Sequence, residues 1–171
     1  MTVKRLRVAF VMDPIEDIKP AKDTTLAMML AAQRRGWELA YLELGHIWLR
    51  DGVAMGRAHA IEARDDAKDW FSRGEPQATR LGDFDVILMR KDPPFDTEYI
   101  YSTYILERAA EAGALVVNRP QGLRDMNEKV YTAWFPECCA PTLITRDMAD
   151  MHAFLREHGR AVCKPLYGMG G

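Results

Sequence analysis

The sequence predicts an α/β protein with a Rossmann-like parallel sheet, followed by the beginning of a second domain. Short apolar, β-rich runs alternate with helical segments through the first 122 residues. A crossover helix returns the chain to the same end of a sheet, so strands that alternate with helices pair in parallel. After residue 122 this alternation stops. We therefore expect a first domain at residues 1–122 and a partial second domain at residues 123–171.

Local signals predict each element of the first domain. Residues 23–25 (Asp-Thr-Thr) offer N-cap oxygens to the first helix, and Gly36 is placed to end it. The dipeptide Asp51-Gly52 predicts a β-hairpin, because its glycine tolerates the positive φ of a tight turn. The expected order is a strand at 6–12, a helix ending at Gly36, a strand at 37–44, a hairpin within 47–61, a strand at 85–89, a helix at 97–112 and a strand at 115–118.

Two regions give weaker signals. Residues 62–82 are charged and irregular apart from Trp70 and Phe71, so we expect a connection without regular structure. In the second domain, Asp125 is placed to cap a helix at 126–135, with Lys129 near its middle. A break, a helix at 147–158 and a strand at 161–164 are expected to follow.

Composition argues against several classes of function. Lysine and arginine number 23 against 25 acidic residues, without a basic block, which argues against nucleic acid as a partner. No apolar run reaches the roughly 20 residues that cross a bilayer, and no cleavage signal opens the chain, so we expect a cytoplasmic protein without membrane attachment. Cys138, Cys139 and Cys163 are expected to be reduced thiols, and the Cys and His spacing indicates no metal site.

The loop after the strand at 85–89 holds the densest group of charges. Ligands of parallel sheets bind outside the carboxyl ends of the strands, where the loops 13–14, 90–96 and 118–120 are expected to meet. Arg90 can hold a carboxylate through two hydrogen bonds, Lys91 offers a point charge, and Asp92 or Asp96 can accept from an amino group. The group suits a zwitterionic, amino-acid-like ligand. The alternative is a solvated turn in which two prolines end the strand.

A glycine-rich turn closes the sequence as Lys164-Pro165-Leu166-Tyr167-Gly168-Met169-Gly170-Gly171. Glycines let backbone N–H groups approach phosphate oxygens without a Cβ in the way. The lysine precedes the glycines, so this is not the loop in which glycines lead to Lys-Ser or Lys-Thr. Lys164 at the end of an apolar strand favours phosphate binding, and a flexible chain end is the alternative. Lys129, by itself, has the pattern of a solvated helical lysine.

Six segments resemble the motifs of one family in their residues, their order and their spacing. They are Val11–Pro14, Ala32–Gly36, Leu88–Asp96, Tyr104–Arg108, Leu123–Lys129 and Lys164–Gly171. Together they resemble bacterial glutathione synthase, over essentially the whole chain. The stretch from Arg90 to Asp96 and the terminal Lys-Pro-Leu-Tyr-Gly-Met-Gly-Gly are the parts that separate this family from most other ATP-grasp ligases.

The resemblance implies a three-part ATP-grasp enzyme, of which this chain matches the Rossmann-like pre-ATP-grasp domain and the beginning of the ATP-grasp domain. It implies a ligase that uses ATP to join γ-glutamylcysteine to glycine through an acyl phosphate, in a cytoplasmic homo-oligomer that is commonly a tetramer. Mg²⁺ or Mn²⁺ is expected, with ligands outside this chain, and the chain alone is expected to be inactive. The implied nucleotide contacts are Lys129, Lys164, Gly168, Gly170 and Gly171, and the implied dipeptide contacts are Asp13, Arg90, Lys91 and Asp92.

Two other functions remain open at the level of the sequence. A stand-alone, non-catalytic module could use the first domain to bind or assemble with a partner. An ATP-grasp ligase with a different amino-acid acceptor would share the same motifs. Both alternatives keep the Rossmann-like domain, so the fold alone does not separate them.

Overall fold

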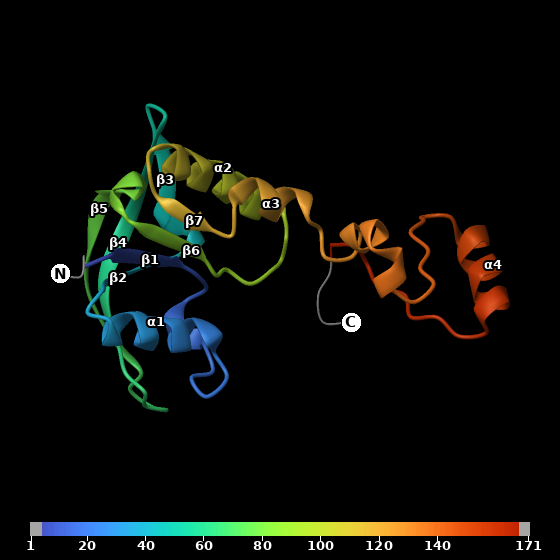
Figure 1. Cartoon of the computed structure of the whole chain (residues 1–171), viewed down its shortest axis with the longest axis horizontal. Helices are drawn as coiled ribbons and strands as arrows, with labels where there is room; N and C mark the ends of the chain where they lie inside the picture. The colour runs from blue at the N-terminus through green and yellow to red at the C-terminus, as the bar shows by residue number, and fades with distance from the viewer. Residues whose placement is uncertain (1–4, 168–171) are drawn as a thin grey trace.

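One mixed sheet of seven strands organises the first part of the protein, with helices on both of its faces (Figure 1). This architecture comes from a computed structural model, which describes residues 5–167. The strands are β1 (Arg7–Val11), β2 (Glu38–Leu42), β3 (Ile47–Arg50), β4 (Val53–Ala63), β5 (Phe71–Arg80), β6 (Val86–Met89) and β7 (Leu115–Val117). The longer helices are α1 (Thr24–Arg34), α2 (Thr97–Glu111) and α4 (Met148–His158), and α3 (Pro120–Asp125) is short.

The centre of the sheet is parallel, as the sequence predicts. β1 pairs in parallel with β2 on one side and with β6 on the other, and β6 pairs in parallel with β7. The sheet becomes antiparallel at β4, which pairs with β2, β3 and β5. The order along the sheet is β3-β4-β2-β1-β6-β7, and β5 adds to β4. The α/β class is confirmed, and the antiparallel strands are an extension of a Rossmann-like core.

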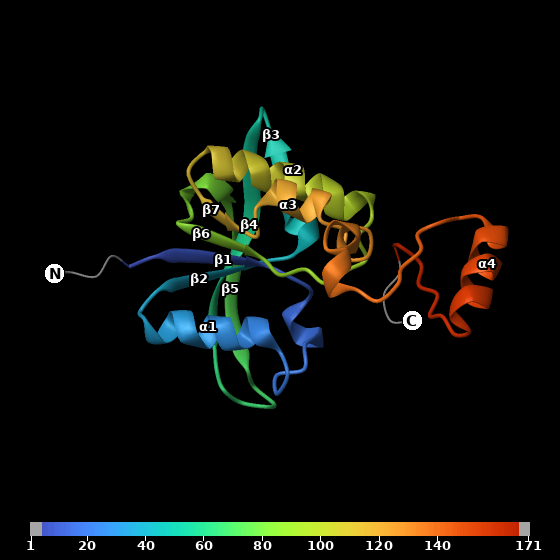
Figure 2. The ribbon, with the colours of Figure 1, turned by 45° about the vertical axis from the view of Figure 1, so that its right-hand side comes forward.

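Two apolar layers hold the helices to the sheet. Successive residues of a strand point to opposite faces, so Phe10 of β1 packs with α1 residues such as Met29, whereas Val11 packs on the side of α2, which contributes Leu106. All four side chains are fully buried. Figure 2 shows α1 on one face and α2 on the other, with α3 lying beside α2. This packing on both faces holds the strands β1, β6 and β7 in place, and their carboxyl ends lie at one edge of the sheet.

The predicted hairpin is present, with Asp51 and Gly52 both at positive φ between β3 and β4. The prediction of an irregular connection at 62–82 is wrong, because β5 occupies Phe71–Arg80 and pairs with β4. The sequence obscures this strand because Gly74 and Pro76 interrupt it and most of its side chains are exposed. Proline is tolerated where a strand lies at the edge of a sheet, and β5 pairs with β4 alone.

Two predictions for the second segment are corrected. The helix expected at 126–135 is absent, because α3 ends at Asp125 and Asn127 then accepts hydrogen bonds from the backbone N–H groups of Lys129 and Val130. Such local side-chain bonds compete with helix formation. Short 3₁₀ turns follow at Tyr131–Trp134 and Pro136–Cys138. The strand expected at 161–164 is also absent, because no described segment pairs with it.

The helix predicted at 147–158 is confirmed as α4. The side chain of Asp147 caps its first turn by accepting from the N–H of Ala149, and Gly159 ends it at φ 73°. The second segment extends away from the sheet in Figure 1, and many of its apolar side chains are exposed, including Trp134 and Val162. Within residues 5–167, no helix combines the length and the apolarity needed to cross a bilayer.

Candidate functional site

Three loops leave the same edge of the sheet. β1, β6 and β7 are consecutive parallel neighbours, so the segments that follow them, 12–14, 90–96 and 118–120, emerge side by side. The amide of Arg90 donates to the carbonyl of Val11 at 2.7 Å, which extends the pairing of β1 and β6 to the start of the loops. The three loops therefore meet at the edge of the sheet where the sequence predicts a ligand site.

An ion pair joins the first two loops. Lys91 Nζ lies 2.7 Å from Asp13 Oδ1, and the backbone N–H of Asp92 donates to Asp13 Oδ2 at 2.8 Å. The Lys91 side chain is 19% exposed and that of Asp13 34%, so the pair is only partly screened by water. Asp13 thus holds both Lys91 and the start of the loop that follows it. The structure brings together three of the four residues expected to contact a dipeptide.

Arg90, the fourth, turns toward the first helix. Its Nε donates to Thr25 Oγ1 at 3.1 Å, and its Nη2 donates to Thr24 Oγ1 at 2.8 Å. The threonines are available because Asp23, and not a threonine, caps α1 by accepting from the N–H of Leu26. Hydroxyl partners leave the guanidinium charge without a neutralising carboxylate at these two contacts. Arg90 therefore keeps a net positive charge to offer an anion.

A pocket of about 550 Å³ is lined by Asp13, Arg90 and Asp92, whereas Lys91 contacts Asp13 without lining the pocket. Its lining alternates cations and carboxylates, which suits a ligand that carries both an amino group and carboxylates. Asp13 of the first loop was among the predicted contacts, whereas the lining residues between 17 and 25 were not, although the density of Lys and Asp at 17–23 was a signal. The lining residues are Met12, Asp13, Pro14, Asp17, Ile18, Lys19, Lys22, Asp23, Thr24, Thr25, Arg90 and Asp92.

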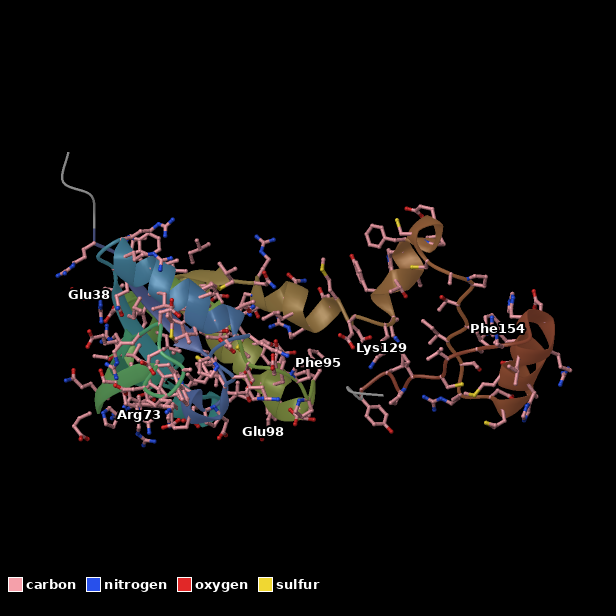
Figure 3. All side chains as sticks on the ribbon, turned by 90° about the horizontal axis from the view of Figure 1, so that it is seen from below. Glu38, Arg73, Phe95, Glu98, Lys129 and Phe154 are labelled. Atoms are coloured by element: carbon pink, nitrogen blue, oxygen red, sulfur yellow. The ribbon has the colours of Figure 1, made fainter. Side chains whose placement is uncertain are left out.

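A second pocket, of about 590 Å³, lies where the first domain meets the segment after α3. Phe95 and Tyr99 form one wall, with ring centroids 5.2 Å apart, and Lys129 lies on the other side. Figure 3 shows Phe95 at the end of the sheet domain nearest to the segment that carries Lys129. The lining residues are Pro93, Phe95, Tyr99, Asn118, Arg119, Gly122, Leu123, Met126, Asn127, Glu128, Lys129, Leu166 and Tyr167.

Lys129 occupies a turn rather than the middle of a helix. Its Nζ lies 3.4 Å from Glu128 Oε1, and its side chain is 18% exposed. Asn127 orders this turn and also donates from Nδ2 to the carbonyl of Leu166 at 3.4 Å. The turn and the segment before the terminal glycines are therefore neighbours, although 39 positions separate Asn127 from Leu166. The sequence gives no signal for the contact between Asn127 and Leu166, because it forms only when the chain folds.

The remaining predicted nucleotide contacts lie apart from both pockets or outside the described residues. Lys164 is exposed and lines neither pocket. Gly168, Gly170 and Gly171 lie beyond residue 167, where the description ends. Among residues 5–167, no group of three or more His, Cys, Asp or Glu side chains is arranged to hold a metal ion.

Two buried tyrosines near the loops have shifted pKa values. Burial raises the pKa of the Tyr41 phenol well above its usual range, and the hydrogen bond to the Glu43 carboxylate adds to the shift. Burial alone raises the pKa of Tyr99, which lines the second pocket. Both hydroxyls therefore stay protonated near neutral pH.

Comparison with known proteins gives two adjoining matches. A model of the prokaryotic glutathione synthetase N-terminal domain matches residues 6–124, and a model of the ATP-grasp domain of the same enzymes matches residues 128–171. Over 166 residues the chain is 54% identical to glutathione synthetase from Yersinia pestis, 51% to that from Vibrio vulnificus and 52% to that from Salmonella typhimurium. These alignments cover 97% of this chain and 52–53% of each relative. The chain therefore spans about half the length of the curated relatives it matches.

Proposed function

Because this chain belongs to the prokaryotic glutathione synthetase family, we propose that it forms the first half of an ATP-dependent ligase joining γ-glutamylcysteine to glycine. The observation that carries the proposal is that two successive domains of that family match one chain in order. We divide the chain at residue 122, so that residues 1–122 bind substrate and residues 123–171 begin the nucleotide-binding domain. The second half would supply the remainder of the nucleotide site.

The pocket around Arg90 is the proposed dipeptide site. γ-Glutamylcysteine carries an amino group and two carboxylates, and the pocket offers cations together with carboxylates. Arg90 would bind one ligand carboxylate, since its partners in the structure are the neutral hydroxyls of Thr24 and Thr25. Asp13 would orient Lys91, and Asp92 would accept from the amino group. The rigid sheet edge supports this site, because preorganised groups lose little freedom when a ligand binds.

The second pocket is the proposed place where the phosphates of ATP meet the dipeptide carboxylate. In the proposed reaction the dipeptide carboxylate attacks the γ-phosphate of ATP, which forms an acyl phosphate and releases ADP. The amine of glycine then displaces phosphate from the acyl phosphate to form the amide bond. Two anions must approach one another in the first step, which is unfavourable unless fixed cations neutralise them. Lys129, ordered by Asn127 and only partly exposed, would serve this purpose. Lys164, Gly168, Gly170 and Gly171 would complete the phosphate contacts.

The divalent metal, the tetrameric assembly and the cytoplasmic location expected from the resemblance belong to this proposal. The metal ligands are assigned to the second half, as the family resemblance implies. The metal would neutralise phosphate charge once it is bound there. The 171-residue chain alone is expected not to turn over.

The test joins this chain, after Gly171, to the matching second half of the Yersinia pestis relative. Glutathione formation and phosphate release are measured with ATP, γ-glutamylcysteine and glycine, and with each substrate omitted in turn. We expect product only when all three are present, and none from the 171-residue chain by itself. α-Glutamylcysteine and alanine serve as matched alternative substrates. A folded fusion that forms no glutathione, or that prefers another acceptor to glycine, would refute the proposal.

A further inference from the structure

Ile15 is held by two side chains from distant parts of the sheet. The Tyr41 hydroxyl accepts a hydrogen bond from the Ile15 N–H at 3.3 Å, and Trp70 Nε1 donates to the Ile15 carbonyl at 3.0 Å. Ile15 is fully buried, its bond with Tyr41 is buried, and its bond with Trp70 is partly buried. Both backbone polar groups of one residue thus depend on side chains that lie 26 and 55 positions away.

The held residue is two positions from Asp13, and Pro14 lies between them. The proline ring fixes φ, which is −49° here, so the short link transmits a displacement of Ile15 to Asp13. On the other side, the N–H of Met12 donates to the carbonyl of Leu42 at 3.0 Å. Asp13 is therefore confined between two anchored neighbours. Its carboxylate in turn contacts Lys91 Nζ and the N–H of Asp92.

We infer that Tyr41 and Trp70 are positioning residues, which clamp Ile15 so that Asp13 holds Lys91 and the loop residue Asp92 beside the proposed dipeptide pocket. This inference rests on the proposed function for its kinetic consequence, and on geometry alone for the structural one. Tyr41 also donates to Glu43 Oε1 at 2.7 Å, which fixes the direction of its hydroxyl hydrogen and leaves a lone pair for Ile15. The β4–β5 extension, which carries Trp70 in its connection, thereby acts on a site that it does not line.

An additional contact strengthens the clamp. Arg73 of β5, labelled in Figure 3, lies with its Nη2 2.8 Å from Glu16 Oε1, and its guanidinium also lies over the Tyr41 ring at 5.7 Å. Residues 15 and 16 are thus both tied to the extension. Because this ion pair is partly exposed, we assign the main effect to the two hydrogen bonds of the fully buried Ile15.

The test substitutes Trp70→Phe, which removes the bond to the Ile15 carbonyl, and Tyr41→Phe, which removes the bonds to the Ile15 N–H and to Glu43. Both variants keep an aromatic ring. Trp48→Phe is the matched control, since Trp48 stacks with Arg57 on the β3–β4 hairpin, away from the loop. The first readout is the amide of Asp92 in the 171-residue chain, followed by NMR. We expect its chemical shift to move and its hydrogen exchange to accelerate in both clamp variants and not in the control. An unchanged Asp92 amide in both folded variants would overturn the inference.

The second readout is kinetic and uses the fusion protein described above. Loss of one hydrogen bond to Ile15 is expected to raise the KM for γ-glutamylcysteine about five- to tenfold, with the KM for ATP unchanged within about twofold. A merely structural role would lower the active fraction and leave both KM values alone, which would contradict positioning. If the parent fusion is inactive, the proposed function fails, and the Asp92 amide still decides the inference.

Discussion

Asp13 and Lys91 form a 2.7 Å ion pair across two adjacent loops, although 78 positions separate them in the sequence. The pair exists because β1 and β6 are parallel neighbours that end at the same edge of the sheet. The same carboxylate also accepts from the N–H of Asp92. One side chain therefore sets the position of the loop to which we assign the dipeptide.

Replacing Asp13 with asparagine should weaken dipeptide binding. The asparagine side chain is similar in size, but it lacks the charge that holds Lys91 and one of the two acceptor oxygens. We expect the Asp13→Asn fusion to show a KM for γ-glutamylcysteine about tenfold higher, the scale of one charge-assisted contact. Steady-state kinetics with dipeptide varied at saturating ATP measure this change.

The control for that substitution is Asp51→Asn, which changes an exposed carboxylate at the tip of the β3–β4 hairpin. It should leave both KM values unaltered. If Asp13→Asn changed the KM for ATP and not that for the dipeptide, the assignment of Asp13 to the dipeptide site would be wrong.

Arg124 should stabilise the packing of α3 on α2. Its Nη2 donates to Glu107 Oε2 at 2.7 Å, its Nη1 donates to Thr103 Oγ1 at 3.1 Å, and its guanidinium lies 4.4 Å from the centroid of the Tyr104 ring. We expect Arg124→Met to lower the free energy of unfolding by about 1–3 kcal/mol, because a partly buried carboxylate loses its partner. Urea titration of the chain, followed by circular dichroism, measures the loss.

A double-mutant cycle separates this ion pair from general packing. Glu107→Gln alone and together with Arg124→Met should give a coupling energy of about 1 kcal/mol. The exposed pair of Arg50 and Asp51, 3.9 Å apart, provides a matched comparison, for which coupling near zero is expected. Equal coupling in the two pairs would show that burial is not what strengthens the Arg124 contact.

Stability should fall in alkaline solution through Tyr41 and Tyr99. Both phenols have pKa values raised by burial, so the folded state retains their protons at a pH where the unfolded chain releases them. Their contribution is complete below the unfolded pKa, near pH 10, and is lost as the pH rises above it. Urea titrations between about pH 9 and 11.5 should show this decline, and Tyr41→Phe should make it shallower.

The exposed Tyr101 supplies the control, since Tyr101→Phe should leave the alkaline slope unchanged. An identical slope for the parent and the Tyr41→Phe chain would mean that the Tyr41 phenol ionises with equal ease in the two states.

Local signals were sufficient for most of the parallel core. The apolar runs of β1 and β6 and the Asp23 cap of α1 are determined by near neighbours, and the structure confirms them. β5 was not predicted, because an edge strand does not need an apolar face and its sequence therefore lacks the usual alternation. Gly74 and Pro76 are also residues that are typical of loops.

The residues of the candidate site were predictable only in part from the sequence. Arg90, Lys91 and Asp92 are adjacent in the sequence, and their charge density marked the loop. The clamp on Ile15 depends on residues 26 and 55 positions away, and the contact of Asn127 with Leu166 spans 39 positions. No pattern of period 2 or 3.6 encodes such contacts. The incorrect helix at 126–135 has a different, local cause, because the Asn127 side chain accepts bonds from the N–H groups of Lys129 and Val130 and forms a turn.

Lys129 should be needed for the use of ATP. It lines the second pocket beside the aromatic wall of Phe95 and Tyr99, and its side chain is mostly covered. A cation fixed where phosphate charge develops is worth more than a solvated one, because it needs no reorganisation. We expect Lys129→Ala in the fusion to lower kcat/KM for ATP about 100-fold, and Lys164→Ala to have an effect of the same kind. Lys68→Ala, in the exposed β4–β5 connection, is the control.

The kinetic parameters that change in the Lys129 variants show whether this residue acts on ATP or on the dipeptide. If it neutralises phosphate in the transition state, kcat should fall while the KM for γ-glutamylcysteine stays the same. Lys129→Arg should restore part of the rate, since it returns the charge with a different shape. A variant with normal ATP kinetics, or one in which arginine restores nothing and the dipeptide KM rises, would remove Lys129 from the nucleotide site and make the turn at Asn127 a structural feature of the domain junction.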